Sequence, residues 1–92
     1  MKRIQRKRSK GWRMPSNAVY VGRPTKFGNP FAVTFFRSRE EAVAEYRSWL
    51  ERVMKKAPSF LDELKGKDLA CWCPLDKACH ADVILEMLEE KQ

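Results

Sequence analysis

Residues 68–90 restrict the fold more than any other part of this chain, because an apolar run is followed there by a proline-containing loop and a helical pattern. The run reads D-L-A-C-W-C and stops at Pro74, which cannot donate a hydrogen bond to a neighbouring strand. From about Cys79 to Glu90, apolar residues recur at the spacing of one helix face. A short strand that leads through a loop into a helix is typical of small α/β proteins.

A longer helix is predicted over residues 38–56. Ser38 and Glu41 have the spacing of a capping box, and Pro58 ends the helix. A shorter helix is expected over Ser59–Lys65, with Gly66 as the residue that terminates it. The buried side of the longer helix is expected to carry Val43, Tyr46, Leu50, Val53 and Met54.

The order of these elements predicts the fold class. A β-prone run, A-V-Y-V, occupies Ala18–Val21, and Phe31–Phe36 has the composition of another short strand. Strand, helices, strand and helix in this order indicate a β-α-β unit. We therefore expect a single α/β domain over residues 14–92, with a small, mostly parallel sheet of two to three strands covered by about three helices. Residues 1–13 show no strand or helix periodicity and are expected to form a basic N-terminal arm.

Charge is unevenly distributed along the chain. Residues 1–39 carry eleven Lys and Arg and no Asp or Glu, whereas the remainder has eight basic and twelve acidic residues. A basic segment of this kind indicates contact with a polyanion or, alternatively, a solubilising tail. Within it, Trp12 and Arg13 are candidates to stack on a base and to contact a phosphate, although Trp12 could equally anchor the arm to the core.

Several protein classes are excluded by composition. No apolar stretch is long enough to cross a bilayer, and the basic N-terminus is not followed by the apolar region of a secretory signal. Three cysteines cannot all be paired in disulfides within one chain. We therefore expect a cytoplasmic protein with reduced thiols and no membrane association.

All three cysteines and the only histidine lie within ten residues, around the junction between the predicted strand and the predicted helix. Cys71 and Cys73 are two residues apart and are expected on one face of the strand, while Cys79 and His80 begin the helix. Three interpretations stay open: a zinc site formed by all four residues, catalysis by Cys79, His80 and Cys73, or buried apolar cysteines beside a locally bonded histidine. The tight C-x-C spacing and the adjacency of Cys79 and His80 count against zinc.

The loop after the first predicted strand offers groups that suit a phosphate or a base edge. It reads R-P-T-K-F-G-N-P-F, and its two prolines limit its flexibility. Guanidinium, hydroxyl, ammonium and amide groups are all present, although the loop matches no established nucleotide-binding motif. The expected ligand-binding residues here are Arg23, Thr25, Lys26, Gly28 and Asn29.

Two motifs of the chain resemble those of a known family. The stretch V-Y-V-G-R-P-T-K-F-G-N-P-F, followed later by C-W-C-P and C-H-A-D, is similar to a small uncharacterised domain of bacteria and their phages. The likeness spans Trp12 to about Leu88, which is nearly the whole chain. The resemblance implies a domain of unknown function and names no activity. By this resemblance the motif positions are Arg23, Pro24, Gly28, Asn29, Pro30, Cys71, Cys73, Cys79 and His80.

Together these features favour binding of a phosphate-bearing ligand, either a nucleic acid or a nucleotide. The expected site is a cleft between the Arg23–Asn29 loop and the Cys73–His80 loop, to which the basic arm adds charge. Two alternatives stay open: an enzyme acting on a nucleotide or nucleobase through Cys79 or Cys73 and His80, and a phage-type protein that sequesters a host nucleotide or protein. Zinc is the cofactor that the cysteine cluster would suit.

Overall fold

The computed structural model describes residues 1–90 as a three-stranded sheet with two α-helices. The elements are β1 (Arg3–Gln5), β2 (Ala18–Tyr20), α1 (Arg39–Lys56), β3 (Asp68–Cys71) and α2 (His80–Glu90). One turn of 3-10 helix, Asp62–Leu64, lies between α1 and β3. The expected α/β domain with a small parallel sheet is therefore confirmed. None of the helices in the described part of the chain is long and apolar enough to span a membrane.

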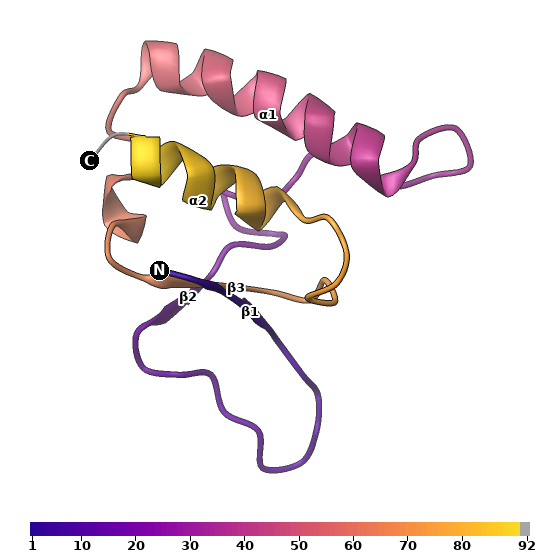
Figure 1. The fold of residues 1–92 in the computed structure, drawn as a ribbon, viewed down its shortest axis with the longest axis vertical. Coiled ribbons are helices and arrows are strands. Elements are labelled where there is room, and N and C mark those ends of the chain that lie inside the picture. Colours follow the sequence, from indigo (N-terminus) through magenta and orange to yellow (C-terminus); the bar gives the residue numbers. More distant parts are fainter. Residues whose placement is uncertain (91–92) are drawn as a thin grey trace.

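Strand β3 is the centre of the sheet. Both edge strands run parallel to it, in the order β1-β3-β2. Leu69 and Ala70 of β3 are fully buried, as expected for a central parallel strand with an apolar sequence. Figure 1 shows both helices on the same side of the sheet, with α2 between α1 and the strands. The segments β2, α1 and β3 form the predicted β-α-β unit.

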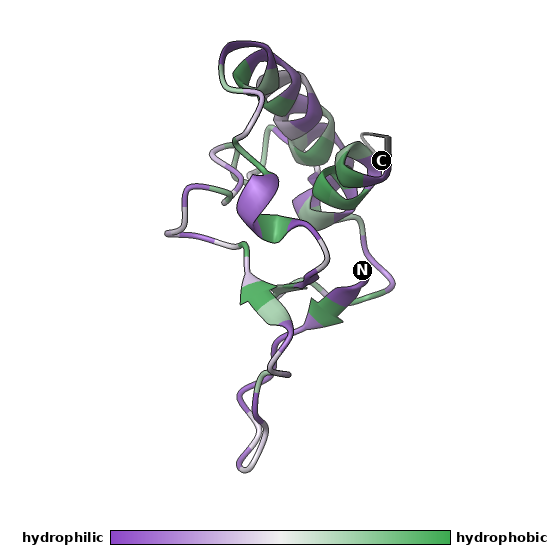
Figure 2. Ribbon diagram, turned by 90° about the vertical axis from the view of Figure 1, so that its left-hand side faces the viewer, coloured by the Kyte–Doolittle hydropathy of each residue, from purple (hydrophilic) through white to green (hydrophobic). Residues whose placement is uncertain are grey.

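The core lies between the helices and the sheet. Tyr46 and Leu50 of α1 are fully buried and belong to one apolar cluster with residues of β3 and α2. Val43 and Val53, expected in the same stripe, are only half-buried, and Ala42 is buried instead. In Figure 2 apolar residues concentrate on the strands and on α2, whereas the connection between β1 and β2 is mostly polar and extends away from the core.

Helix α1 begins at the predicted capping box. Ser38 Oγ accepts a hydrogen bond from Glu41 N (3.1 Å), and Glu41 Oε1 accepts one from Ser38 N (3.3 Å). Ser38→Ala removes the first bond and should lower the free energy of unfolding by about 1 kcal/mol in urea denaturation. Ser48→Ala, at an exposed position of the same helix, is the control and should change it by less than about 0.5 kcal/mol. Equal losses in the two variants would show that the cap contributes nothing.

Three details of secondary structure differ from expectation. Residues 59–65 form no α-helix but a single 3-10 turn, since seven residues are too few to sustain one. Residues 31–36 form no strand, because Thr34 and Arg37 bond to each other in a tight hairpin and not to the sheet. The first part of the expected arm instead forms β1, since the free edge of β3 offers residues 3–5 a full set of backbone partners.

Candidate functional site

The candidate site is a pocket at the carboxyl ends of the strands. Parallel strands end at the same edge of a sheet, and ligands of open α/β sheets bind there. A pocket of about 380 Å³ lies between the loops that follow β2 and β3 and the first turns of both helices. Its walls include Arg23 and Arg39, the aromatic rings of Tyr20, Phe31 and Trp72, and the cysteines Cys71, Cys73 and Cys79.

The loop after β2 is held in one conformation by its own polar groups. Tyr20 Oη donates a hydrogen bond to Arg23 O (2.7 Å), and Arg23 Nε donates one to Asn29 O (2.7 Å). Asn29 Nδ2 donates to Ala42 O in α1 (3.2 Å), and Asn29 Oδ1 accepts from Phe31 N (2.8 Å). Asn29 lines the pocket as expected, but both ends of its side-chain amide fix the loop against α1.

Several expected ligand-binding residues do not line this pocket, namely Thr25, Lys26, Gly28, Trp12 and Arg13. The last two lie in the connection between β1 and β2. Lys26 forms an ion pair with Glu63. A Cβ atom at Gly28 would lie 3.0 Å from Arg23 N, so glycine there lets the loop close on itself. Of the basic groups expected in this loop, the structure therefore brings only Arg23 to the pocket.

Sequence reasoning misses Arg39, which lines the pocket from the first turn of α1. Its Nη1 lies 3.5 Å from Cys73 Sγ and donates to Ala78 O (3.4 Å). Within residues 1–90, neither Arg23 nor Arg39 forms an ion pair with a carboxylate. A positive side chain at a helix N-terminus opposes the helix dipole, and that unfavourable position is the sequence signal that could have identified Arg39.

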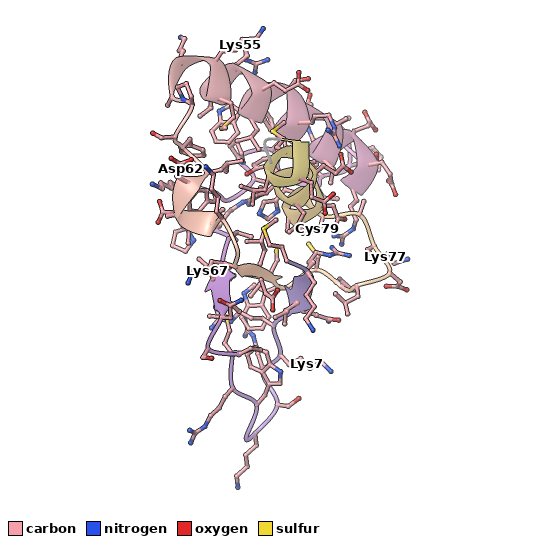
Figure 3. The ribbon with its side chains drawn as sticks, turned by 60° about the vertical axis from the view of Figure 1, so that its left-hand side comes forward. Lys7, Lys55, Asp62, Lys67, Lys77 and Cys79 are labelled. Carbon is pink, nitrogen blue, oxygen red and sulfur yellow. The ribbon has the colours of Figure 1, made fainter. Side chains whose placement is uncertain are left out.

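The three cysteine side chains converge at one wall of the pocket. Cys71 ends β3, Cys73 follows two residues later, and Cys79 directly precedes α2. Their sulfur atoms lie within 4.8 Å of one another, and those of Cys71 and Cys73 are 3.8 Å apart, as their predicted common face requires. Figure 3 shows Cys79 between α2 and the sheet. All three are free thiols, and together they could hold a metal ion.

Negative charge in this cluster is centred on Cys79. Hydrogen bonds from the thiols of Cys71 and Cys73 lower the pKa of Cys79 to about 3, and the backbone N–H of Ala81 and the side chain of Arg3 act in the same direction, against burial. Hydrogen bonds to Cys73 and Cys79, together with burial, raise the pKa of the Cys71 thiol. The surroundings therefore favour the thiolate form at Cys79 and the protonated form at Cys71.

Strand β1 supplies a buried cation to the same region. The side chain of Arg3 is only 8% exposed, and its Nε lies 3.3 Å from Asp82 Oδ1. Its Nη2 donates to Leu75 O (2.7 Å) and to Lys77 O (2.9 Å), which ties the loop before α2 to the sheet. Its Nη1 is buried and has no hydrogen-bond partner among the described residues. Arg3 therefore belongs to the framework of the cysteine cluster, although it lies in the expected basic arm of residues 1–13.

His80 is fixed on the other side of Cys79. Burial lowers the pKa of the imidazole and favours its neutral form, and Nε2 donates a hydrogen bond to Val21 O (2.8 Å), because a carbonyl oxygen can only accept. Its Nδ1 lies 3.7 Å from Cys79 Sγ, and the ring packs edge-on against Tyr46. His80 is not among the residues whose ligand atoms converge. The structure therefore brings together three of the four predicted metal ligands.

Basic residues of the connection between β1 and β2 reach the pocket through its aromatic rim. The guanidinium of Arg6 lies 4.7 Å from the ring centroids of both Tyr20 and Trp72, and that of Arg8 lies 4.8 Å from the centroid of Trp72. Contacts of this length between a cation and an aromatic face are attractive. The basic segment thus contacts two of the aromatic rings that line the pocket, although Arg6 and Arg8 do not line it themselves.

Comparison with known proteins identifies the family. A family model described as a domain of unknown function (DUF4326) matches residues 4–90. The chain belongs to DUF4326. The matched range of this DUF4326 domain contains every residue of the pocket, and it confirms the resemblance to an uncharacterised domain family. No curated protein and no solved structure gave a significant match to it.

Proposed function

We propose that the pocket binds a phosphate-bearing ligand, either a nucleotide or a nucleic acid. The observation that carries this proposal is the pair Arg23 and Arg39, which line the pocket without a carboxylate partner in the described part of the chain. Some basic side chains elsewhere do pair with a carboxylate, as Arg37 does with Glu45. Two uncompensated guanidinium groups favour a ligand that carries its own negative charge, and phosphate accepts paired hydrogen bonds from arginine.

The aromatic walls favour a ligand that also carries a flat ring. Tyr20, Phe31 and Trp72 line the same pocket as the two arginines. Bases stack on such side chains with little dependence on their identity. The pocket volume of about 380 Å³ falls within the range of about 300–1,000 Å³ that is usual for small-molecule sites. A phosphate next to a stacking surface fits a nucleotide or a polynucleotide better than it fits inorganic phosphate.

Zinc is the metal ion that we propose for the three thiols. A zinc–sulfur distance of about 2.3 Å in a tetrahedral site separates neighbouring sulfurs by about 3.8 Å. Cys71 Sγ and Cys73 Sγ are 3.8 Å apart, and Cys79 Sγ lies within 4.8 Å of both. Three thiolates around Zn²⁺ leave one excess negative charge, and the buried Arg3 beside Cys79 would balance it. A cytoplasmic location belongs to the same proposal, because the thiols must stay reduced to bind metal.

This zinc ion would keep one exchangeable coordination position. The three thiolates fill three of the four tetrahedral positions, and His80 is not among the residues whose ligand atoms converge there. All three cysteines line the pocket, so the fourth position would open toward the proposed ligand. Zinc sites with four protein ligands are structural, whereas those with three hold water or a substrate atom. The metal would thus take part in ligand binding.

An enzyme that acts on a nucleotide or nucleobase is the second candidate function. It is favoured by the approach of Cys79 Sγ to His80 Nδ1, 3.7 Å, and by the low pKa of Cys79. If Cys79 and His80 are catalytic, Cys79→Ser and His80→Gln should abolish turnover while ligand affinity stays within a few-fold. If the pocket only binds, no turnover is detected, and affinity depends on Arg23 and Arg39.

The proposed binding is tested by titrating the protein with ATP and with labelled oligothymidylate at increasing salt concentration. Because bound phosphate displaces counterions, two arginine–phosphate contacts predict a slope of about −1.4 for log K against log salt with single-stranded DNA. Native mass spectrometry of gently purified protein provides an independent check, since a retained nucleotide adds its own mass to the chain. Negligible affinity for both ligands at low salt would refute the proposal.

A further inference from the structure

Two phenylalanines project into solvent from the hairpin of residues 31–37. Phe35 is 95% exposed and Phe36 is 88% exposed. Their rings contact each other edge-on, with centroids 5.1 Å apart, and lie outside the apolar core. Two adjacent aromatic rings at the tip of a turn contribute nothing to the core of this domain. An exposed pair of aromatic rings of this kind is typical of a surface that binds another molecule.

The hairpin holds these rings in a defined position. Thr34 and Arg37 exchange backbone hydrogen bonds of 2.9 and 3.2 Å, and Thr34 Oγ1 accepts a further bond from Phe36 N (3.2 Å). Arg37 Nε forms an ion pair with Glu45 of α1 (2.7 Å), which fixes the base of the hairpin to the helix. A braced turn loses little conformational freedom when its tip binds a partner.

The hairpin is continuous with the pocket. Phe31 and Val33, on its first side, line the pocket wall, and the guanidinium of Arg37 lies 5.4 Å from the centroid of Phe31. A ligand that extends out of the pocket along this wall would reach Phe35 and Phe36, which closely follow Val33 in the sequence. The exposed pair therefore extends one side of the candidate site.

A second aromatic surface lies at another part of the pocket rim. Trp72 is 37% exposed, lines the pocket and carries the guanidinium groups of Arg6 and Arg8 on its ring. In Figure 1 the loop that follows β3 lies between the connection of β1 to β2 and the hairpin that precedes α1. The arginine-lined pocket is thus flanked by Trp72 and by the Phe35–Phe36 pair.

We propose that the ligand is a single-stranded polynucleotide that crosses the pocket and stacks bases on Phe35 and Phe36. This inference rests on the proposed function and extends it, because a mononucleotide would fill the pocket without reaching Phe35 and Phe36, which do not line it. The charge of the N-terminal part of the chain also favours a polynucleotide, since residues 1–39 contain eleven basic and no acidic residues. A membrane surface would favour one continuous apolar face, whereas Phe35 and Phe36 follow a pocket wall in the chain and that pocket also carries Arg23 and Arg39.

Affinity should rise with the length of the strand. Oligothymidylates of one, three, six and twelve nucleotides are titrated by fluorescence anisotropy or by competition. The Phe35→Ala/Phe36→Ala double variant should bind the twelve-nucleotide strand about 30-fold more weakly, because each lost stacking surface costs at least several-fold in affinity. Its affinity for the mononucleotide should stay unchanged. Phe35→Tyr/Phe36→Tyr keeps the rings and should bind the long strand as tightly as the original chain.

The alternative results would each overturn this inference, and each would point to a different ligand or contact. If one nucleotide binds as tightly as twelve, the ligand is a mononucleotide, and the proposed function stands. If neither binds, the proposed function fails as well. If the alanine double variant binds the long strand normally but loses binding to vesicles of phosphatidylserine and phosphatidylcholine, the hairpin contacts a membrane. Loss of long-strand affinity in the tyrosine variant would show that apolar contact, not stacking, is what the hairpin provides.

Discussion

Cys79→Ser should weaken zinc binding at least about 100-fold, because a hydroxyl ionises poorly and cannot replace a thiolate ligand. Serine is itself a favourable residue before the first turn of a helix, so α2 should still form in this variant. Affinity is measured by competition with a zinc chelator, and the stoichiometry by native mass spectrometry. Cys71→Ser and Cys73→Ser should give losses of the same order, since the three sulfurs converge within 4.8 Å.

Removal of the metal should also lower thermal stability. Zinc present at about 1,000 times its dissociation constant stabilises the folded state by about 4 kcal/mol. For a domain of this size, that corresponds to a fall in melting temperature of about 15–30 °C when a chelator is added. Cys79→Ser should show no such dependence on the chelator.

His80→Gln is the matched control for the cysteine variants. Glutamine can keep a donor near the position of Nε2, which bonds Val21 O, while it removes the imidazole as a metal ligand. Zinc affinity in this variant should stay within a few-fold of the original value. A loss as large as that of Cys79→Ser would make His80 the fourth ligand and would close the proposed open position. Unchanged zinc affinity in all three cysteine variants would contradict a metal site here.

The second large effect concerns the two arginines of the pocket. Arg23→Ala and Arg39→Ala should each weaken nucleotide binding about 10- to 100-fold, since each removes a charged hydrogen bond to phosphate. Arg39→Ala also removes a positive charge from the N-terminus of α1, so helix stability should be retained or slightly increased. Weaker binding together with unchanged or higher stability would separate a loss of ligand contact from a loss of folding.

Arg52→Ala provides the control for this prediction. Arg52 also lies on α1, but it does not line the candidate pocket. It is one turn from Lys55, which Figure 3 places at the end of α1 remote from Cys79. The variant removes the same charge and should change affinity less than about two-fold at moderate salt. Equal losses in Arg39→Ala and Arg52→Ala would mean that net charge, and not the pocket, determines binding.

The parts of the fold that depend on local sequence could be predicted. The capping box at Ser38 appears as expected, and the strand predicted for residues 68–73 forms but ends two residues earlier, at Cys71. Strand β1 could not be predicted, because residues 3–5 carry no alternating pattern and their partner lies in β3, at the other end of the sequence. The hairpin of residues 31–37 has a β-prone composition, but only the folded chain shows that it bonds to itself.

The same limit applies to the candidate site. The cysteines and Arg23 could be selected from local motifs, and the structure places them in one pocket. Arg3 and Arg39 could not, because their roles depend on contacts with loops more than thirty residues away along the chain. The sequence also does not show that the side-chain amide of Asn29 is already hydrogen-bonded, to Ala42 O in α1 and to Phe31 N in its own loop. Local sequence identified reactive groups, whereas long-range contacts determine which of them are available.

The strand order has a consequence for how this chain folds on the ribosome. Strands β1 and β2 do not pair with each other, and each finds its hydrogen-bond partners only in β3. β3 is synthesised last of the three, in the final third of the sequence. The residues of β1 and β2 therefore stay unpaired in the nascent chain until β3 emerges. Formation of the sheet is a late folding step, because it joins segments far apart in the sequence. Because Cys71 belongs to β3 and Cys73 and Cys79 follow it, the proposed metal site is complete only after β3 and the loop behind it have been synthesised.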